Sequence, residues 1–311
     1  MTAPLSARRG LKIVEVVVVV AIVGIVAIFA LIRAPRSRES ARLLSCKSNL
    51  MQIGFALTQY HDDAERLPIA RIGGEGPLRA CLEVLAIPDF SMVTDPKKRS
   101  PKQPGFVIKE GPVRGFICPT DRNATAGRLA APISYRGSTG SSGNGRGGAF
   151  DLGAEVTFSQ VEAGDGLSHT SAFSERLVGD LGPANRPTAA TMQFVPSALN
   201  EPPCPEAAPG AWLTDAGASW WVANWNSTLY NHSATPNTRP NCLSADGRSG
   251  IVSASSEHLE GVNVLLLDGS VRTYGIKVDP GIWRALGTIQ DSPVPAPTPP
   301  ASPSTPAVGS K

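Results

Sequence analysis

An apolar run near the N-terminus constrains this chain more than any other feature of its sequence. The segment from Ile13 to Ile32 is almost wholly aliphatic and follows a short basic leader that ends in Gly10. A helix needs roughly 20 apolar residues to cross a bilayer, so the run predicts a single transmembrane helix. Glu15 is the one charge within the run, and a carboxylate in lipid costs free energy unless a partner compensates it.

The order Arg8-Arg9-Gly10, Leu11, Glu15 and an aliphatic helix resembles the start of type IV pilins and type II secretion pseudopilins. The resemblance implies that a prepilin-type peptidase cuts after Gly10 and methylates the new terminus at Leu11. The ammonium group of Leu11 would then lie one helical turn from Glu15, and the two opposite charges would make each other tolerable in lipid. In an assembled filament, Glu15 would instead meet the amine of a neighbouring subunit. A plain signal anchor with an incidental glutamate is the alternative.

Basic residues flank the run on both sides, so the positive-inside rule does not assign its orientation. The arginines that follow the run are Arg33, Arg36, Arg38 and Arg42. With a net charge of only +3, this cluster favours contact with anionic lipid headgroups over nucleic-acid binding. The resemblance and the cysteines place the main domain outside the cytoplasm. We therefore expect a single-pass protein of the inner (cytoplasmic) membrane.

Beyond the apolar run, hydrophobic residues recur at spacings of three and four, which places them on one face of a helix. They are Leu43, Cys46, Leu50, Ile53, Leu57 and Tyr60. The rest of the chain is rich in loop formers, with 31 Gly and 28 Pro in all. We expect an α+β, pilin-like fold: a long N-terminal helix, membrane-spanning in its first half, packed on an antiparallel, loop-rich β domain. A short coiled-coil stalk is the alternative for the helical stripe.

Short β-prone runs between Gly and Pro predict strands at 105–108, 115–118, 154–158, 170–175 and 262–267. The last run leads into Asp268-Gly269, a pair that favours a tight hairpin with both turn residues at positive φ. Further on, Asp279 and Pro280 predict the N-cap and the first turn of a short helix.

Five blocks of sequence resemble the DUF1559 family of planctomycete proteins, whose members begin with a pilin-like methylation segment. The blocks are CKSNLMQIGFALTQYHD (46–62), FICPTD (116–121), ISYRGSTG (133–140), DGLSHTSAFSER (165–176) and SSEHLEGVNVLLLDGSVR (255–272). In the last block His258 precedes Asp268-Gly269 by ten residues, which is the H-x9-DG signature of the family. The resemblance implies a pilin-like start and no known biochemical activity.

These features predict five consecutive parts of the chain. They are a leader (1–10), the transmembrane half of the helix (11–34), its extra-membrane half (35–65), a β-rich, DUF1559-like extracytoplasmic domain (66–291) and a Pro/Ser-rich tail (292–311). The composition of the tail predicts disorder.

The five cysteines fit an oxidising compartment, and none forms the close spacing of a zinc site. Cys204 and Cys242 lie in irregular Pro- and Asn-rich sequence that has little core to hold it, so we expect them to pair. Cys46 faces inward on the helix, and a bond to Cys118 would tie the helix to the sheet. Cys81 would then be free. The alternative is that all five are reduced and merely buried.

Catalytic patterns are weak. GNGRGG (143–148) matches GxGxxG, but it neither follows a hydrophobic strand nor opens a helix, so the dinucleotide interpretation fails. The histidines at 61, 169, 232 and 258 are scattered, and His258 with Asp268 is the best candidate site. We favour a structural role, in which Asp268 shapes its turn and His258 bonds a loop backbone group. Asp246 and Asp268 are weak calcium candidates. We expect no enzyme activity, no cofactor and no metal.

Three tryptophans, Trp220, Trp221 and Trp225, offer a surface for the apolar faces of sugars, although we expect at least two of them in the core. Two functional hypotheses remain. The first is a membrane-anchored pilin or pseudopilin-like subunit, processed by a prepilin peptidase, that forms homo- or hetero-oligomers with pilin-like subunits. The alternative is an anchored surface module that binds glycans or other ligands and uses the pilin-like segment only for export.

Overall fold

The computed structural model describes residues 13–74, 76–77, 111–182, 188–205 and 212–290. For residues 13–15 and 26–37 it describes the backbone but not the side chains. The chain divides into two compact units at the junction of Leu44 and Ser45. Helix α1 (Ile13–Ala64) contributes its first part to one unit and its last part to the other. The expected leader (1–10), tail (292–311) and strand at 105–108 lie outside the described residues, as does Cys81.

The last part of α1 packs on its own domain through one face. The buried residues of this face are Cys46, Leu50, Ile53, Ala56 and Leu57. Leu44, Met51 and Phe55 lie on other sides of the helix and are exposed. Gly54 permits a close approach, because a Cβ there would come 2.9 Å from Leu265 Cδ1. The predicted apolar stripe therefore covers the domain that follows it in the chain.

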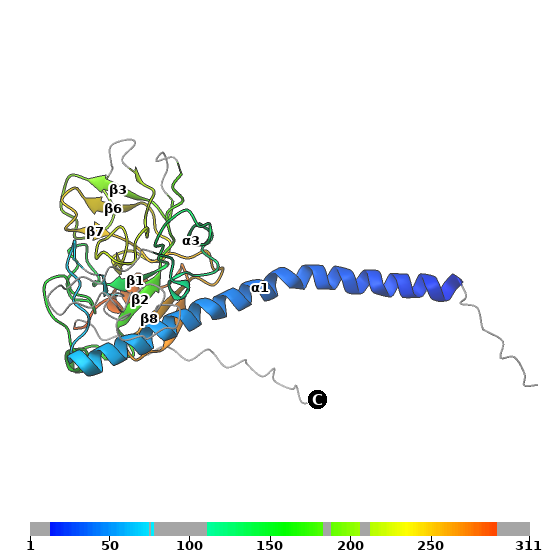
Figure 1. The fold of residues 1–311 in the computed structure, drawn as a ribbon, viewed down its shortest axis with the longest axis horizontal. Coiled ribbons are helices and arrows are strands. Elements are labelled where there is room, and N and C mark those ends of the chain that lie inside the picture. Colours follow the sequence, from blue (N-terminus) through cyan, green and yellow to red (C-terminus); the bar gives the residue numbers. More distant parts are fainter. Residues whose placement is uncertain (1–12, 75, 78–110, 183–187, 206–211, 291–311) are drawn as a thin grey trace, which may run out of the picture. The chain divides into compact units, whose positions relative to one another are not determined.

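A five-stranded sheet, in the order β5-β1-β2-β8-β9, lies against this face of α1 (Figure 1). Its strands are β1 (Tyr135–Ser138), β2 (Ser171–Glu175), β5 (Leu229–Tyr230), β8 (Val262–Leu266) and β9 (Val271–Tyr274). Strands β1, β2, β8 and β9 pair antiparallel, whereas β5 runs parallel to β1. All five residues of β8 are buried, as expected of a strand covered on both faces.

A second sheet has the order β4-β3-β6-β7. Its strands are β3 (Met192–Val195), β4 (Trp212–Leu213), β6 (Asn241–Ser244) and β7 (Gly250–Ile251). Here β3 and β6 are parallel, and the flanking pairs are antiparallel. A small separate core, which contains Val195, Cys242 and Ile251, holds this sheet.

The expectation of an antiparallel β domain behind a membrane-spanning helix is wrong. The domain is a mixed α/β structure, because both sheets contain a parallel pair. Parallel neighbours need a crossover of a dozen or more residues, so they leave no hairpin signal in the local sequence. The antiparallel expectation followed from the pilin-like resemblance together with the hairpin signal at 262–274.

The membrane expectation is corrected as well. In the part of the chain that the structure describes, no helix combines the length and the apolar character needed to cross a membrane. This finding overturns the single-pass inner-membrane localisation.

Of the short elements predicted from the sequence, some are confirmed and others are wrong. Residues 115 and 116 belong to the 3-10 helix η2 (Arg114–Phe116) and 117–118 follow it, while 154–158 lead into helix α4 (Phe158–Ala163), so neither run is a strand. The strands at 170–175 and 262–267 are confirmed as β2 and β8.

The hairpin is present, but only Gly269 of its turn has a positive φ. Helix α5 (Pro280–Ala285) begins as predicted, with Asp279 accepting hydrogen bonds from the amides of Gly281 and Ile282.

A buried histidine joins α5 to the main sheet. His232 is fully buried, and its Nδ1 lies 2.8 Å from the carbonyl oxygen of Trp283. A carbonyl only accepts, so Nδ1 carries the hydrogen, and Nε2 accepts from the Tyr230 hydroxyl at 2.8 Å. Burial lowers the pKa of His232 from 6.5 to about 3, so the ring stays neutral in the fold.

This histidine predicts a loss of stability in acid. Below pH 6.5 the unfolded chain takes up a proton that the folded chain rejects until about pH 3. His232 by itself should therefore contribute a fall of about 1.4 kcal/mol per pH unit in the free energy of unfolding as the pH drops from 6 to 4, opposite in sign to the contribution of Asp121, whose pKa is raised by burial. His232→Gln should flatten that slope in urea titrations. Ile282→Ala, a non-titrating change on α5, should keep the wild-type slope, and equal slopes for all three proteins would contradict the assignment.

Candidate functional site

A disulfide fastens α1 to the domain. Cys46 lies on the buried face of α1, and Cys118 follows η2 and precedes helix α3 (Arg122–Thr125). The two sulfurs are bonded, with their Cα atoms 5.1 Å apart, within the usual range for a disulfide. The bond closes a loop of chain between residues 72 positions apart. It agrees with the pairing expected from the sequence.

A buried carboxylate lies beside this disulfide. Glu175 ends β2 and is only 2% exposed. Its Oε2 accepts from the backbone N–H of Asn263, and its Oε1 accepts from the Asn263 side chain, both at 2.9 Å. Asn263 is itself held, because its Oδ1 accepts from the Thr273 hydroxyl at 2.8 Å. Two strands, β8 and β9, thus fix the orientation of one carboxylate.

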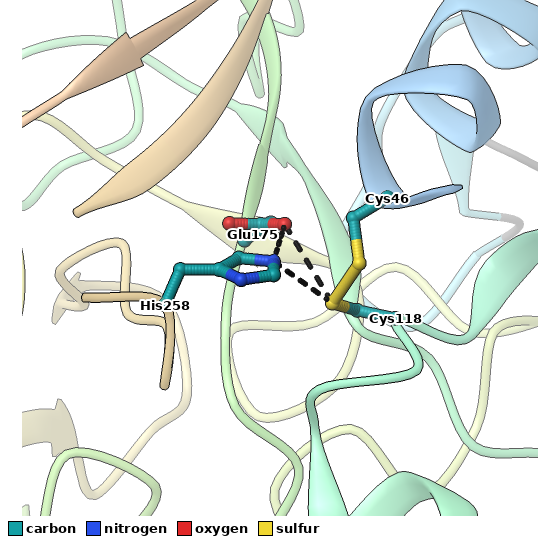
Figure 2. Close-up of side chains that lie close together, drawn as sticks. All are labelled: Cys46, Cys118, Glu175 and His258. Carbon is teal, nitrogen blue, oxygen red and sulfur yellow. Dashed lines mark hydrogen bonds and ion pairs between the residues drawn. A yellow bond between two sulfur atoms is a disulfide. The ribbon is translucent and has the colours of Figure 1, made fainter. Parts of the chain in front are cut away.

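His258 completes the cluster from the loop between β7 and β8 (Figure 2). Its Nε2 lies 3.3 Å from Glu175 Oε1 and 3.4 Å from Cys118 Sγ. Glu175 Oε1 lies 3.7 Å from the same sulfur. A disulfide sulfur has no proton to donate, so that last contact is an approach and the His258–Glu175 contact is the charge-assisted hydrogen bond. Cys46, Cys118, Glu175 and His258 are all buried.

The phenol of Tyr135 adds a polar contact between the sheet and α1. Its hydroxyl accepts from Asn49 Nδ2 at 3.2 Å and lies 3.5 Å from the carbonyl oxygen of Cys46. Burial raises the pKa of Tyr135 well above its ordinary value, and the nearby Glu175 charge raises it further. The phenol therefore stays protonated and can donate to the helix.

A small pocket opens next to the cluster. Its lining residues are Cys118, Asp121, Ser134, Glu175, Arg176, Leu177, Ser255 and Ser256. Asp121 caps α3 by accepting from the Ala124 amide, and it also accepts from Ser134 Oγ and the Val178 amide. Burial nevertheless raises the pKa of Asp121 to about 6, against the opposing effect of those hydrogen bonds.

Two buried arginines stand near these acids. Arg176 donates through one nitrogen to the carbonyls of Ser253 and Ala189, and burial lowers its pKa to about 9. Arg136 donates to the carbonyl of Trp225, and burial, with the neighbouring Arg176 charge, lowers its pKa well below the usual range. The charge of Asp121 opposes this lowering at Arg136, so these two groups partly offset the cost of removing each other from water.

The cluster draws residues from every one of the five blocks identified in the sequence. Cys46, Cys118, Tyr135, Glu175 and His258 come from the first to the fifth block in turn. Their positions in the chain are far apart, and only the pairing of β1, β2 and β8 brings them together. Sequence reasoning missed Glu175, Asn263 and Tyr135, although the blocks that contain them were a usable signal.

His258 and Asp268 do not meet. Asp268 is exposed in the β8–β9 turn, where its Oδ1 accepts from the Ser270 amide and hydroxyl, so it shapes the turn as expected. Gly269 supplies the positive φ of that turn. Nε2 of His258 contacts Glu175 and Cys118, and the bonding of a loop backbone group by this residue stays a prediction.

The remaining candidates lie elsewhere. Cys204 and Cys242 form the second expected disulfide, and Cys242 is a residue of β6. Trp220 and Trp225 are buried and Trp221 is half-buried, packed edge-on against Trp220. Asp246 accepts hydrogen bonds within its own turn, away from Asp268. Gly10 and Leu11 lie outside the described residues, and of Glu15 only its place in α1 is described.

Comparison with known proteins adds one match. A family model described as "Protein of unknown function (DUF1559)" matches residues 35–281. No curated protein and no solved structure matches the chain.

The disulfide at the site predicts a large, local contribution to stability. For a loop of 72 residues, the Cys46→Ala/Cys118→Ala double variant should lose about 4 kcal/mol in the free energy of unfolding. Hydrogen exchange of residues 45–64 should also accelerate, because α1 loses its covalent link to the domain. Cys204→Ala/Cys242→Ala is the control: it should destabilise without that local acceleration. Unchanged exchange in the first variant would contradict the role assigned to the bond.

Proposed function

The chain belongs to the DUF1559 family, and on that premise we propose that it acts as a pilin-like or pseudopilin-like assembly subunit. A prepilin-type peptidase cuts it after Gly10 and methylates Leu11. The processed subunit then joins other pilin-like subunits through the first part of α1. The family description names no activity, so the proposal rests on the residues of this chain.

The proposal is based on the exposed apolar residues of α1 between Val16 and Ile25. The exposed apolar residues there are Val16, Val17, Val18, Val19, Val20, Ile22, Val23 and Ile25, with exposed fractions of 47% to 65%. Consecutive positions point in all directions around a helix, so this segment is apolar on every side. Such a surface is stable in an assembly that covers it, and a large exposed apolar patch marks an interaction site.

The last part of α1 supports the same role. Packing, the Cys46–Cys118 bond and the Asn49–Tyr135 hydrogen bond hold it on the domain. This part of α1 is therefore already covered and held by the domain. The two disulfides also fit a protein that works in an oxidising compartment.

The glycan-binding alternative receives no such support. It depended on an aromatic platform formed by three tryptophans, and Trp220 and Trp225 are buried. We therefore carry a single function forward.

Processing can be tested on the mature N-terminus. Mass spectrometry of the protein from its native host should find Leu11, methylated, as the first residue. Gly10→Val should leave the leader in place, because a branched side chain disturbs the cleavage position. Gly24→Ala is the matched control, since a Cβ on Gly24 would meet no atom within 4 Å and cleavage should continue. An intact leader in the wild-type protein would rule out processing.

Assembly can be tested on the apolar surface. Val19→Lys should abolish cross-linked oligomers of the processed protein, because a charge then enters the contact between helices. Leu44→Lys is the control: Leu44 is 66% exposed on the same helix and lies outside the apolar segment, so oligomers should persist. Glu15→Ala should weaken assembly by removing the partner of the neighbouring amine. Oligomers that survive both Val19→Lys and Glu15→Ala would overturn the proposal.

A further inference from the structure

The buried cluster of Cys46, Cys118, Glu175 and His258 has the composition of a metal site. Its possible ligand atoms, two sulfurs, one ring nitrogen and one carboxylate oxygen, all lie within 4.8 Å of one another. Sulfur and imidazole ligands with one carboxylate suit Zn²⁺, which is borderline soft and tetrahedral. We propose that reduction of the Cys46–Cys118 bond converts this cluster into a zinc-binding site. Either a disulfide or a bound metal ion would then link α1 to the domain.

The distances between ligand atoms support a tetrahedral site. With bonds of about 2.3 Å to sulfur and about 2.1 Å to nitrogen and oxygen, neighbouring ligands of a tetrahedral zinc ion lie about 3.3–3.8 Å apart. The three distances among His258 Nε2, Glu175 Oε1 and Cys118 Sγ are 3.3, 3.4 and 3.7 Å. One face of the tetrahedron is thus already formed. The two sulfurs, which are bonded to each other, lie too close together, and Cys46 Sγ lies within 4.8 Å of the other ligand atoms.

The surroundings of the ligands are also those of a metal site. Protein ligands of metals are oriented by hydrogen bonds from a second layer of residues. Asn263 holds both oxygens of Glu175, and Thr273 holds Asn263. A plain structural disulfide has no need of a buried carboxylate and a buried imidazole at its side, since burying them costs free energy. A small pocket borders Cys118 and Glu175 at the edge of the cluster.

The conversion takes place in two steps, and electrons and protons are accounted for in each. A dithiol reductant gives two electrons and two protons, so that its own thiols form a disulfide while the Cys46–Cys118 bond opens to two thiols. Zn²⁺ then binds both sulfurs as thiolates and releases two protons, while Glu175 and neutral His258 supply the other ligands. The bound site would carry one net negative charge, with Arg176 among the neighbouring groups that line the pocket.

The test uses the full chain with Cys81, Cys204 and Cys242 replaced by serine, so that Cys46 and Cys118 are the only cysteines left. After reduction with a phosphine and its removal under anaerobic conditions, Co²⁺ is titrated as a spectroscopic probe of the zinc site. We expect one metal ion per chain, a thiolate-to-cobalt charge-transfer band and the intense visible bands of tetrahedral Co²⁺. The oxidised protein should show none of these.

Two variants identify the other ligands. His258→Gln and Glu175→Gln should each weaken Co²⁺ binding at least about 10-fold, since even outer residues of metal sites contribute that much. His169→Gln and Glu162→Gln, made at positions away from the cluster, should bind like the parent. Parent-like affinity in both cluster variants, or a reduced parent without the charge-transfer band, would overturn the proposal.

A measurement without any further variant covers the case in which the ligand variants fail to fold. X-ray absorption of the zinc-loaded, reduced parent should show two sulfur atoms at about 2.3 Å and two nitrogen or oxygen atoms at about 2.0–2.2 Å. A first shell of nitrogen and oxygen alone would overturn the site. The outcome is independent of the assembly proposal, which concerns a different part of α1.

Discussion

Attachment of α1 to the five-stranded sheet depends on a polar cluster buried beneath the helix. The Cys46–Cys118 bond fixes one point of α1 covalently, and the Asn49–Tyr135 hydrogen bond fixes a second close by. Apolar packing of residues such as Leu50 and Leu57 then follows from the position that these contacts impose. A helix held by packing alone could slide along a sheet, whereas a bond and directional hydrogen bonds allow one register.

Burying charged groups costs free energy, and the interior of the domain contains hydrogen-bond partners that compensate for this cost. Glu175, Asp121 and two arginines are removed from water, and each such charge is tolerable only with partners. Asn263 supplies donors to Glu175, and three donors converge on Asp121. Replacing such networks by apolar residues often leaves stability unchanged or improves it, so their presence points to a role beyond holding the fold.

The two parts of α1 have opposite requirements. The first part carries apolar residues on all sides and is exposed, so it requires other apolar surface to cover it. The last part carries a single buried stripe and is already satisfied by the domain. A link between the last part of α1 and the domain that responds to reductant and to metal would let the chemical state of the compartment set how firmly that part of the helix is held.

The sequence by itself determined what depends on neighbours along the chain. The helical stripe from Cys46 to Leu57, the turn at Asp268-Gly269 and the cap at Asp279 were predictable, because spacing and local backbone preference fix them. Membership of the DUF1559 family was equally legible in the five blocks. The antiparallel topology and the membrane-spanning helix were not, since both followed from the pilin-like resemblance, supported by one hairpin signal and one apolar run.

Only the tertiary structure decided which residues form the site. Glu175 and His258 are 83 positions apart, and nothing local to either indicates the other. They meet because β2 pairs with β8, and because the loop before β8 returns to the end of β2 where Cys118 lies. The chemistry of these side chains depends on which of them lie close together in space. Strand order and register decide that proximity, and the spacing of the residues along the chain does not show it.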